Sequence, residues 1–429
     1  MPVVRRRWGA LLAGTLMLAG LTLPVAPAAY ADEAGCDGID DDTTEVDEVR
    51  MPSAPLTELR VEEATELLAE RGTAPGQGVG VAVVDSGIAD DAPITTVGGF
   101  RAAPHSKTDL DTYYHGTAVA GLIAGDARPG GEPVGIAPAA SIYDVRVYDA
   151  PEDSDDGELG GLTDAGVVAG LRWVAANVSS GPDRIRIVNV SLALKPSKEL
   201  EAVVNRLAAL GVVVVAAAGN RPADDTDPVL GDFAGDARPG EDAARVVYPA
   251  GYLPVVAATS SVPRGVDARE FVVQNSATDI AAPTINGVSY AVNGVSCLLP
   301  AEAATSWAAA EISGVLALLM SAYHEHPSRT LARLYRTATG AGELTTRLTG
   351  HGVVQPVEAL QRPLTFEKSG YPETSEINNT VQKALAPRPD EDVLADTRRD
   401  AVWWGLAGGG ALVIAMLLRP VLARRRKSP

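Results

Sequence analysis

Residues 78–87 read GVGVAVVDSG, and this short valine-rich run that ends in an acidic turn indicates a buried strand. Runs of the same kind recur along the chain. They are residues 141–149, 184–193, 211–220 and 255–260. Short apolar strands without a polar alternation are typical of a parallel sheet that is covered on both faces.

Helical stretches separate these strands. Apolar residues recur at helical spacing over residues 115–125, 163–178 and 198–210, and also over 56–72, where Gly72 offers a stop. The alternation of strands and helices predicts the α/β class, a three-layer fold with helices on both sides of a mostly parallel central sheet.

The composition narrows the class of protein. The chain has 429 residues, a formal net charge of −19 and two cysteines. Such an acidic balance argues against a nucleic-acid partner. Without its two terminal segments the chain keeps about 370 residues, enough for one large domain with extensions.

The N-terminal segment has the layout of a secretory signal peptide. Arg5, Arg6 and Arg7 precede an apolar run, and small residues before Asp32 predict cleavage after Ala31, so that residues 1–31 are the signal peptide. Residues 32–76 form an acidic extension. An alternative interpretation is a lipid-anchored Cys36, but residues 33–35 lack the leucine that such a site needs.

The C-terminal segment has the layout of a membrane anchor. Residues 401–418 carry no charge, and a helix of that length reaches roughly 27 Å, just enough for a hydrocarbon core. Trp403 and Trp404 stand at one edge, and the basic tail, residues 419–429, should stay in the cytoplasm. The alternative is a buried core helix. Residues 363–400, polar and proline-bearing, are the expected linker.

Both termini therefore place the domain between them, residues 77–362, outside the cytoplasm and tethered to the cell membrane by a single pass. Cys36 and Cys297 both fall in this exported part. Since that compartment is oxidising, the two cysteines are expected to form a disulfide.

Four polar residues stand at strand ends or helix starts, where an α/β sheet collects its functional groups. Asp85 ends the run 78–84, His115 opens the helix 115–125, Asn220 ends the run 211–218, and Ser306 precedes an apolar helix. Each residue alone is common in a turn or a helix cap.

Together these residues predict acyl transfer. A serine hydroxyl needs an adjacent base to act as a nucleophile, and the base needs an acid that orients it. The reaction also needs donors for the developing oxyanion, which a side-chain amide and a backbone N–H can supply.

The motifs that hold these residues resemble the signature blocks of the subtilisin family of serine proteases. They are DSG at 85–87, HGTAVAG at 115–121, GN at 219–220 and TSWA at 305–308. The resemblance extends over about residues 78–360. With the signal peptide, the cysteine-bearing extension and the C-terminal span, the chain is similar to the mycosins, membrane-anchored proteases associated with type VII secretion.

This resemblance implies a role for each residue. Asp85 would orient the imidazole, His115 would be the general base, Ser306 the nucleophile and Asn220 the oxyanion donor. Residues 191–193 (Ser191, Leu192 and Ala193) match the family strand that pairs with substrate backbone. The implied partners are a protein or peptide substrate and the type VII secretion membrane complex.

No metal or cofactor is expected. His324 and His326 lie two residues apart, a spacing that does not place both on one helix face, so they are interpreted as surface residues.

The chain departs from the family at three positions. Ala193 and Ala304 stand where the family has glycine, and Ala310 stands where it has proline. The Ala304 methyl is expected either to strain the backbone or to crowd the acyl group. Glu311 adds a carboxylate to the same helix, where the helix dipole would tolerate it.

Two alternatives to the enzyme therefore stay open. One is a catalytically weak or inactive protease-like domain that acts as a structural component of the secretion machinery. The other is an extracellular binding module in which the triad arose by chance.

Overall fold

The computed structural model describes residues 35–39, 49–108, 113–152, 154, 157–340, 344–364 and 395–425. The chain divides into a body that extends to Glu373 and a C-terminal unit that begins at Thr374. The predicted signal peptide lies outside the described residues, as does most of the predicted linker.

A seven-stranded sheet forms the centre of the body, and all of its pairings are parallel. Its strand order is β2-β3-β1-β4-β5-β6-β7. The strands are β1 (Gly80–Asp85), β2 (Thr96–Arg101), β3 (Ser141–Arg146), β4 (Ile185–Val190), β5 (Val213–Ala217), β6 (Val255–Ser261) and β7 (Ile280–Pro283). The five strands expected from the valine-rich runs are β1, β3, β4, β5 and β6, and this prediction is confirmed.

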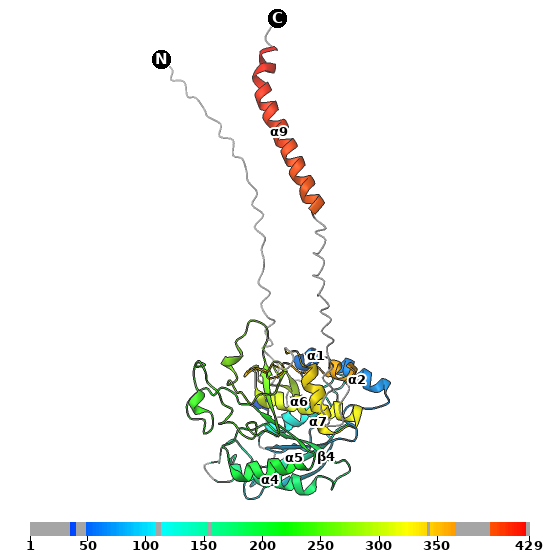
Figure 1. The fold of residues 1–429 in the computed structure, drawn as a ribbon, viewed down its shortest axis with the longest axis vertical. Helices are drawn as coiled ribbons and strands as arrows, with labels where there is room; N and C mark the ends of the chain where they lie inside the picture. Colours follow the sequence, from blue (N-terminus) through cyan, green and yellow to red (C-terminus); the bar gives the residue numbers. More distant parts are fainter. Residues whose placement is uncertain are drawn as a thin grey trace, which may run out of the picture. The chain divides into compact units, whose positions relative to one another are not determined.

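Helices cover both faces of the sheet. Successive residues of β1 point to opposite faces, so that Val81 packs in the apolar core with α3 (His115–Ala124) and α6 (Thr305–Tyr323). Ala82 packs in the core with α4 (Asp164–Asn177) and α5 (Lys198–Ala209). Figure 1 shows α4 and α5 on one side of the sheet and α6 on the other. The predicted three-layer fold is therefore confirmed.

Helix α6 runs through the core of the body. Among the described residues it is the one helix that is long and apolar enough to cross a membrane, but 94% of its apolar window is buried inside the body. Burial of this extent identifies α6 as a core helix, and it carries Ser306 as its second residue.

The single helix predicted over residues 56–72 is wrong. The structure has two helices there, α1 (Ala54–Glu58) and α2 (Val61–Glu70), and Arg60 between them adopts a left-handed backbone with φ of 55°. The Arg60 guanidinium binds Glu63 and reaches Glu358 on α8 (Pro356–Gln361). Helical spacing alone does not reveal such a break, because the apolar residues of both helices still face the core.

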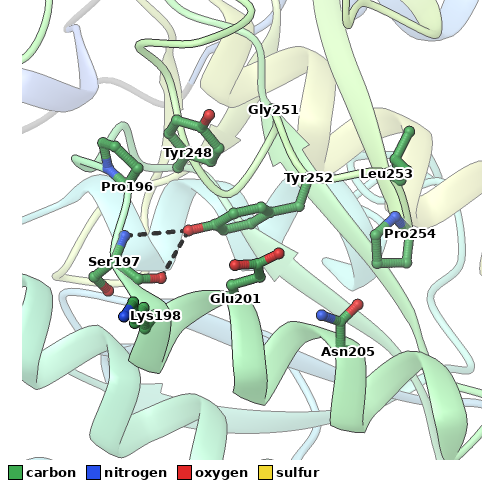
Figure 2. Close-up of a pocket in the computed structure, with 10 residues that line it drawn as sticks. All are labelled: Pro196, Ser197, Lys198, Glu201, Asn205, Tyr248, Gly251, Tyr252, Leu253 and Pro254. Carbon is green, nitrogen blue, oxygen red and sulfur yellow. Dashed lines mark hydrogen bonds between the residues drawn. The ribbon is translucent and has the colours of Figure 1, made fainter.

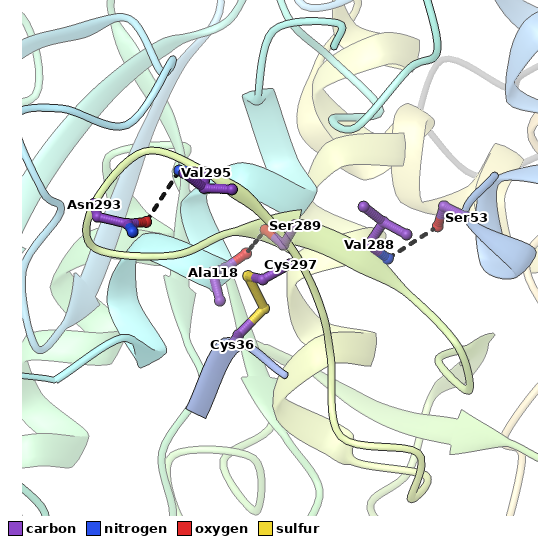
Figure 3. Close-up of a disulfide and its surroundings, with 8 residues drawn as sticks. All are labelled: Cys36, Ser53, Ala118, Val288, Ser289, Asn293, Val295 and Cys297. Carbon is purple, nitrogen blue, oxygen red and sulfur yellow. Dashed lines mark hydrogen bonds between the residues drawn. A yellow bond between two sulfur atoms is a disulfide. The ribbon is translucent and has the colours of Figure 1, made fainter. Parts of the chain in front are cut away.

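The N-terminal extension is fastened to the body by covalent and polar contacts. Cys36 forms the predicted disulfide with Cys297, which lies in the antiparallel pair of β8 (Val288–Tyr290) and β9 (Ser296–Leu298). Figure 3 shows the Val288 N–H close by, donating to the Ser53 hydroxyl. The Arg128 guanidinium adds bonds to two carbonyls of the extension.

The remaining elements are short, apart from the last helix. They are η1 (Cys36–Gly38), η2 (Gly231–Phe233), η3 (Ala268–Glu270), α7 (Pro327–Thr337) and α9 (Ala395–Arg425). Helix α9 contains residues 401–418 and begins six residues before them, within the predicted linker. Its apolar stretch, Trp403–Arg419, is shorter than α6.

Candidate active site

The carboxyl ends of three neighbouring strands bring the predicted residues together. Asp85 is the last residue of β1, Ser191 follows β4, and Asn220 follows β5. These strands are adjacent in the sheet, so residues that follow them gather at one edge. His115 and Ser306 reach this edge from the first turns of α3 and α6, two helices that pack against each other.

Asp85 and His115 form a hydrogen-bonded pair. The His115 Nδ1 lies 2.8 Å from the Asp85 Oδ1, and the two side chains are 12% and 1% exposed. A carboxylate only accepts, so Nδ1 carries the proton and donates, which leaves Nε2 as the basic nitrogen. The ring also stacks on Tyr113, with centroids 6.0 Å apart.

The residue after Ser306 packs on this imidazole. The ring of the next residue, Trp307, is 4.9 Å from the His115 ring, centroid to centroid. Among the described residues no hydrogen bond joins the Ser306 hydroxyl to His115. Such bonds are often long before substrate binds, so their absence does not argue against the pairing.

Asn220 is held with its amide group turned outward. Its Oδ1 accepts from the backbone N–H of Thr305 at 2.7 Å and from the Thr305 hydroxyl at 2.9 Å. Because donors fix the oxygen, the NH₂ group must point the other way, and Asn220 is exposed. The Ser306 N–H has no acceptor within the described residues, as expected at the start of a helix. Two unused donors, the Asn220 NH₂ group and the Ser306 N–H, therefore belong to residues that bond to Thr305 or follow it.

Buried hydrogen bonds fix the predicted substrate segment, residues 191–193. The Ser191 hydroxyl donates to the Ser306 carbonyl at 2.9 Å and accepts from the Asn189 amide at 2.9 Å. The Ser313 hydroxyl on α6 donates to the Asn189 Oδ1 at 3.0 Å. This buried chain of bonds fixes the segment relative to α6, and the Ser191 side chain faces inward.

A tyrosine fixes the chain a few residues beyond this segment, at Ser197. The Tyr252 hydroxyl accepts from the Ser197 N–H at 3.2 Å and donates to the Ser197 carbonyl at 2.9 Å, as Figure 2 shows. These residues line a separate pocket of about 480 Å³ at the start of α5. The backbone of Leu194 pairs with Tyr248 of the same region. The segment from Ser191 to Ser197 is thus held at both ends.

A cleft of about 540 Å³ opens over His115 and the predicted substrate segment. One wall comes from the chain after β3, and the other comes from the chain after Asn220. Its lining residues are Tyr113, His115, Tyr148, Pro151, Glu152, Leu162, Ser191, Leu192, Ala193, Pro222, Ala223, Asp224, Thr226, Asp227, Pro228 and Val229. A peptide in this cleft would pass over the imidazole.

Two tyrosines near the pair stay protonated at neutral pH. Burial, followed by the charge of Asp85, raises the pKa of Tyr113 to about 12. The same two causes raise the pKa of Tyr148 well above its ordinary value. Both phenols are therefore neutral donors rather than anions.

The backbone at Ala304 is unstrained. Its φ of −131° and ψ of 136° are an extended conformation that any residue adopts. The expectation that this alanine strains the chain beside Ser306 is therefore wrong, and only crowding by its methyl group is left. Ala310 lies inside α6, fully buried, where alanine favours the helix.

Sequence reasoning missed three residues that build the site. Thr305 orients Asn220, Trp307 packs on His115, and the Tyr148 hydroxyl donates to Asp85 at 2.9 Å. Thr305 and Trp307 lie in the TSWA motif and could have been suspected from it. Tyr148 carries no signal of its own beyond its position near the end of a predicted strand.

His324 and His326 lie away from this edge. Both are exposed, and His326 caps α7 by accepting from the Ser328 N–H. Their interpretation as surface residues agrees with these positions.

Comparison with known families gives one match that covers most of the body. Residues 76–352 match the family described as Subtilase family, Peptidase_S8. This range includes every residue assigned above to the candidate active site.

Individual relatives give a consistent picture. M-protease of Shouchella clausii is 31% identical over 299 residues, which are 67% of this chain and 65% of the relative. Mycosin-1 of Mycobacterium tuberculosis is 30% identical over 381 residues, or 82% of each chain. The chain therefore spans just under two thirds of the first relative and most of the second.

A solved structure also aligns with the body. The structure of "MycP3 protease from the type VII (ESX-3) secretion system" matches with a TM-score of 0.56 and 26% identity. The match covers 77% of this chain and 92% of that one.

Proposed function

The chain belongs to the subtilase family, and on this premise we propose that it is a membrane-anchored serine endopeptidase of the mycosin type, which acts outside the cytoplasm in association with type VII secretion. The observation that carries the proposal is the Asp85–His115 hydrogen bond, together with the packing of Trp307, the residue after Ser306, on that imidazole. A serine becomes a nucleophile only in such a setting.

The proposed reaction begins with acylation. Nε2 of His115 takes the proton of the Ser306 hydroxyl as Oγ attacks the substrate carbonyl carbon. Asp85 holds the imidazole in the required tautomer and stabilises the imidazolium that forms. The imidazolium then protonates the leaving amine, and the peptide bond breaks.

The residues of this site also stabilise the oxyanion and carry out the second half of the reaction. In this proposal the Asn220 NH₂ group and the Ser306 N–H donate to the negative oxygen of the tetrahedral intermediate. Water, deprotonated by His115, then attacks the acyl group and releases the second product. Ser306 regains its proton at the end of the cycle.

Leu192 and Ala193 are the residues that we propose pair with the substrate. Both line the cleft together with His115, and the bonds of Ser191 and Ser197 fix the chain on either side of them. A strand fixed in this way can add a substrate strand through main-chain hydrogen bonds.

The membrane anchor is supported by α9 itself. Large apolar side chains are exposed along it, among them Trp403 (67%), Trp404 (76%) and Leu412 (57%). An exposed apolar helix of this kind needs a lipid environment, and the basic residues after it favour a cytoplasmic C-terminus. Association with type VII secretion rests on the similarity to Mycosin-1 and MycP3.

A fluorophosphonate probe tests the enzymatic part of this proposal without knowledge of the substrate. The full chain in detergent should be labelled, and Ser306→Ala should abolish the labelling. Ser321→Ala is the matched control: it removes a buried hydroxyl from the same helix, which within the described residues bonds to the Leu318 carbonyl and the Gly76 N–H. This control should be labelled like the wild type.

The same experiment identifies the alternative. If the folded wild-type chain is not labelled at all, the domain is not a serine peptidase, and the two non-catalytic alternatives, a structural component of the secretion machinery and an extracellular binding module, are left.

A further inference from the structure

The Asp85 carboxylate receives all of its hydrogen bonds on one oxygen. Oδ1 accepts from the Ser86 N–H at 2.8 Å, from the His115 Nδ1–H at 2.8 Å and from the Tyr148 hydroxyl at 2.9 Å. Oδ2 is buried and has no partner within the described residues. The phenol and the imidazole therefore compete for the same acceptor.

The position of Tyr148 follows from the sheet. Strand β3 lies beside β1, with Arg146 opposite Asp85, and the Val147 N–H donates to the Asp85 carbonyl at 2.8 Å. This pairing carries Tyr148 past the end of β1 to the Asp85 side chain. Tyr148 is 2% exposed, so water does not replace Asp85 as the acceptor of its hydroxyl.

We propose that Tyr148 is a positioning residue of the active site, which moderates the bond between Asp85 and His115. This inference rests on the proposed function. A donor on a carboxylate draws off part of its negative charge, so less of that charge stabilises a protonated His115. Tyr148 thus weakens the bond that favours the protonated, inactive imidazole, so the enzyme should keep its activity to a lower pH.

Other charged and titratable groups surround the pair and stay constant in the test. Arg146 from β3 binds Asp149 at 3.0 Å, and its side chain packs along Gly87. Tyr113 stacks on His115, and the charge of Asp37, from η1, reaches Tyr113. None of these side chains is changed by a substitution at position 148.

The test is the pH dependence of labelling by a fluorophosphonate, compared between the wild type and Tyr148→Phe. In this reaction Ser306 Oγ bonds to phosphorus, fluoride leaves, and the serine proton passes to His115. The rate therefore falls as His115 becomes protonated. In Tyr148→Phe the midpoint of this acid limb should move to higher pH, by about 0.3 to 1 unit.

Tyr143→Phe is the matched control. Tyr143 lies on β3, five residues before Tyr148, is equally buried, and donates its hydroxyl to the Asp183 carbonyl at 2.6 Å, away from Asp85. Its loss should leave the acid limb where the wild type has it. An acid limb in Tyr148→Phe that stays within 0.1 unit of the wild type, or moves to lower pH, overturns the inference, whatever happens to the maximal rate.

A second measurement is independent of catalysis. In the proton NMR spectrum of the full chain at low pH, the His115 Nδ1–H resonance should move downfield in Tyr148→Phe, because its bond to Asp85 strengthens. This readout remains usable if the wild type is not labelled, so a failure of the proposed function is distinct from a failure of this inference. A resonance that is unmoved or moves upfield refutes the role of Tyr148.

Discussion

Ala304 occupies the position directly before the helix of Ser306. Its extended backbone removes strain as a cause of slow catalysis, and its side chain is half-buried next to the nucleophile. Only steric crowding of the acyl group is left to lower the rate. The effect of crowding should therefore grow with the size of the group that approaches Ser306.

We expect Ala304→Gly to accelerate acylation by up to about tenfold, which corresponds to about 1.4 kcal/mol. The gain should be larger for a peptidyl fluorophosphonate than for a small alkyl one, and Ala310→Pro should change neither rate by much. Labelling rates for both probes measure this. Equal rates in the glycine variant and the wild type would mean that the methyl group is accommodated.

Glu311 is the most isolated ionisable group in the described part of the chain. It is fully buried in α6, and neither of its carboxyl oxygens has a hydrogen-bond partner within the described residues. Burial, followed by the charge of Glu58, raises the pKa of Glu311 well above its ordinary value. A neutral acid is thus favoured, rather than the carboxylate that a helix dipole would tolerate.

The upward shift of the Glu311 pKa predicts that the stability of the folded body depends on pH. Because the folded-state pKa of Glu311 is above the unfolded one, its contribution is fully present below about pH 4.3 and is lost as the pH rises toward the folded-state pKa. Glu311→Gln cannot ionise. Its melting temperature relative to the wild type should therefore rise between pH 4 and pH 9.

The comparison of Glu311→Gln with the wild type isolates the contribution of Glu311 to this pH dependence. Burial raises the pKa of Asp279 to about 6, but Asp279 is present in both chains and cancels in the difference. A difference in melting temperature that stays flat across this pH range would show that Glu311 does not titrate as its burial implies.

At the scale of single residues, the sequence predicted the residues of the proposed reaction but not the residues that hold them. Asp85, His115, Asn220 and Ser306 were identifiable because their motifs are local. Tyr148 reaches Asp85 only because β3 pairs with β1, across a separation of 63 residues. Such a contact exists only once the sheet has formed, so no local pattern contains it.

At the scale of elements, the burial and the length of a strand together decided whether the sequence predicted it. Strand β1 is buried along its whole length and reads as an apolar run, whereas β2 is an edge strand that contains two glycines and exposed residues. Strand β7 is the other edge, has four residues and ends at Pro283. Strand β2 lacks the apolar run of a buried strand, and β7 is buried but only four residues long, so neither was predicted.

The disulfide ties the N-terminal extension covalently to the body. It closes a separation of 261 residues, for which a chain-entropy model gives about 5 kcal/mol as an upper value. Replacing both Cys36 and Cys297 by serine should lower the melting temperature, by roughly 5–10 °C. The wild type with reductant is the control and should melt with the variant.

The bonds from Arg128 and Ser53 do not depend on the disulfide. Probe labelling of the double variant at low temperature should therefore match the wild type. If the variant melts like the oxidised wild type, the bond contributes nothing, and the extension is held by its packing alone.

At the scale of the whole molecule, the proposed topology places the body outside and the C-terminus in the cytoplasm. A reporter fused after Pro429 should be active only in the cytoplasm, because Arg419 and the cluster at residues 424–427 follow the proposed span. Changing these basic residues to glutamine is the control, and it should weaken the preference of the C-terminus for the cytoplasm. An externally active reporter on the natural chain would contradict the topology.

The central claim is that one hydroxyl, at Ser306, is the nucleophile and that His115 activates it. Mass-spectrometric peptide mapping of the full chain after fluorophosphonate labelling tests this most directly. The account predicts a single phosphonate adduct, on Ser306, that forms more slowly in His115→Ala by about a hundredfold or more. An adduct on another residue, or one that forms on Ser306 equally fast without His115, would contradict it.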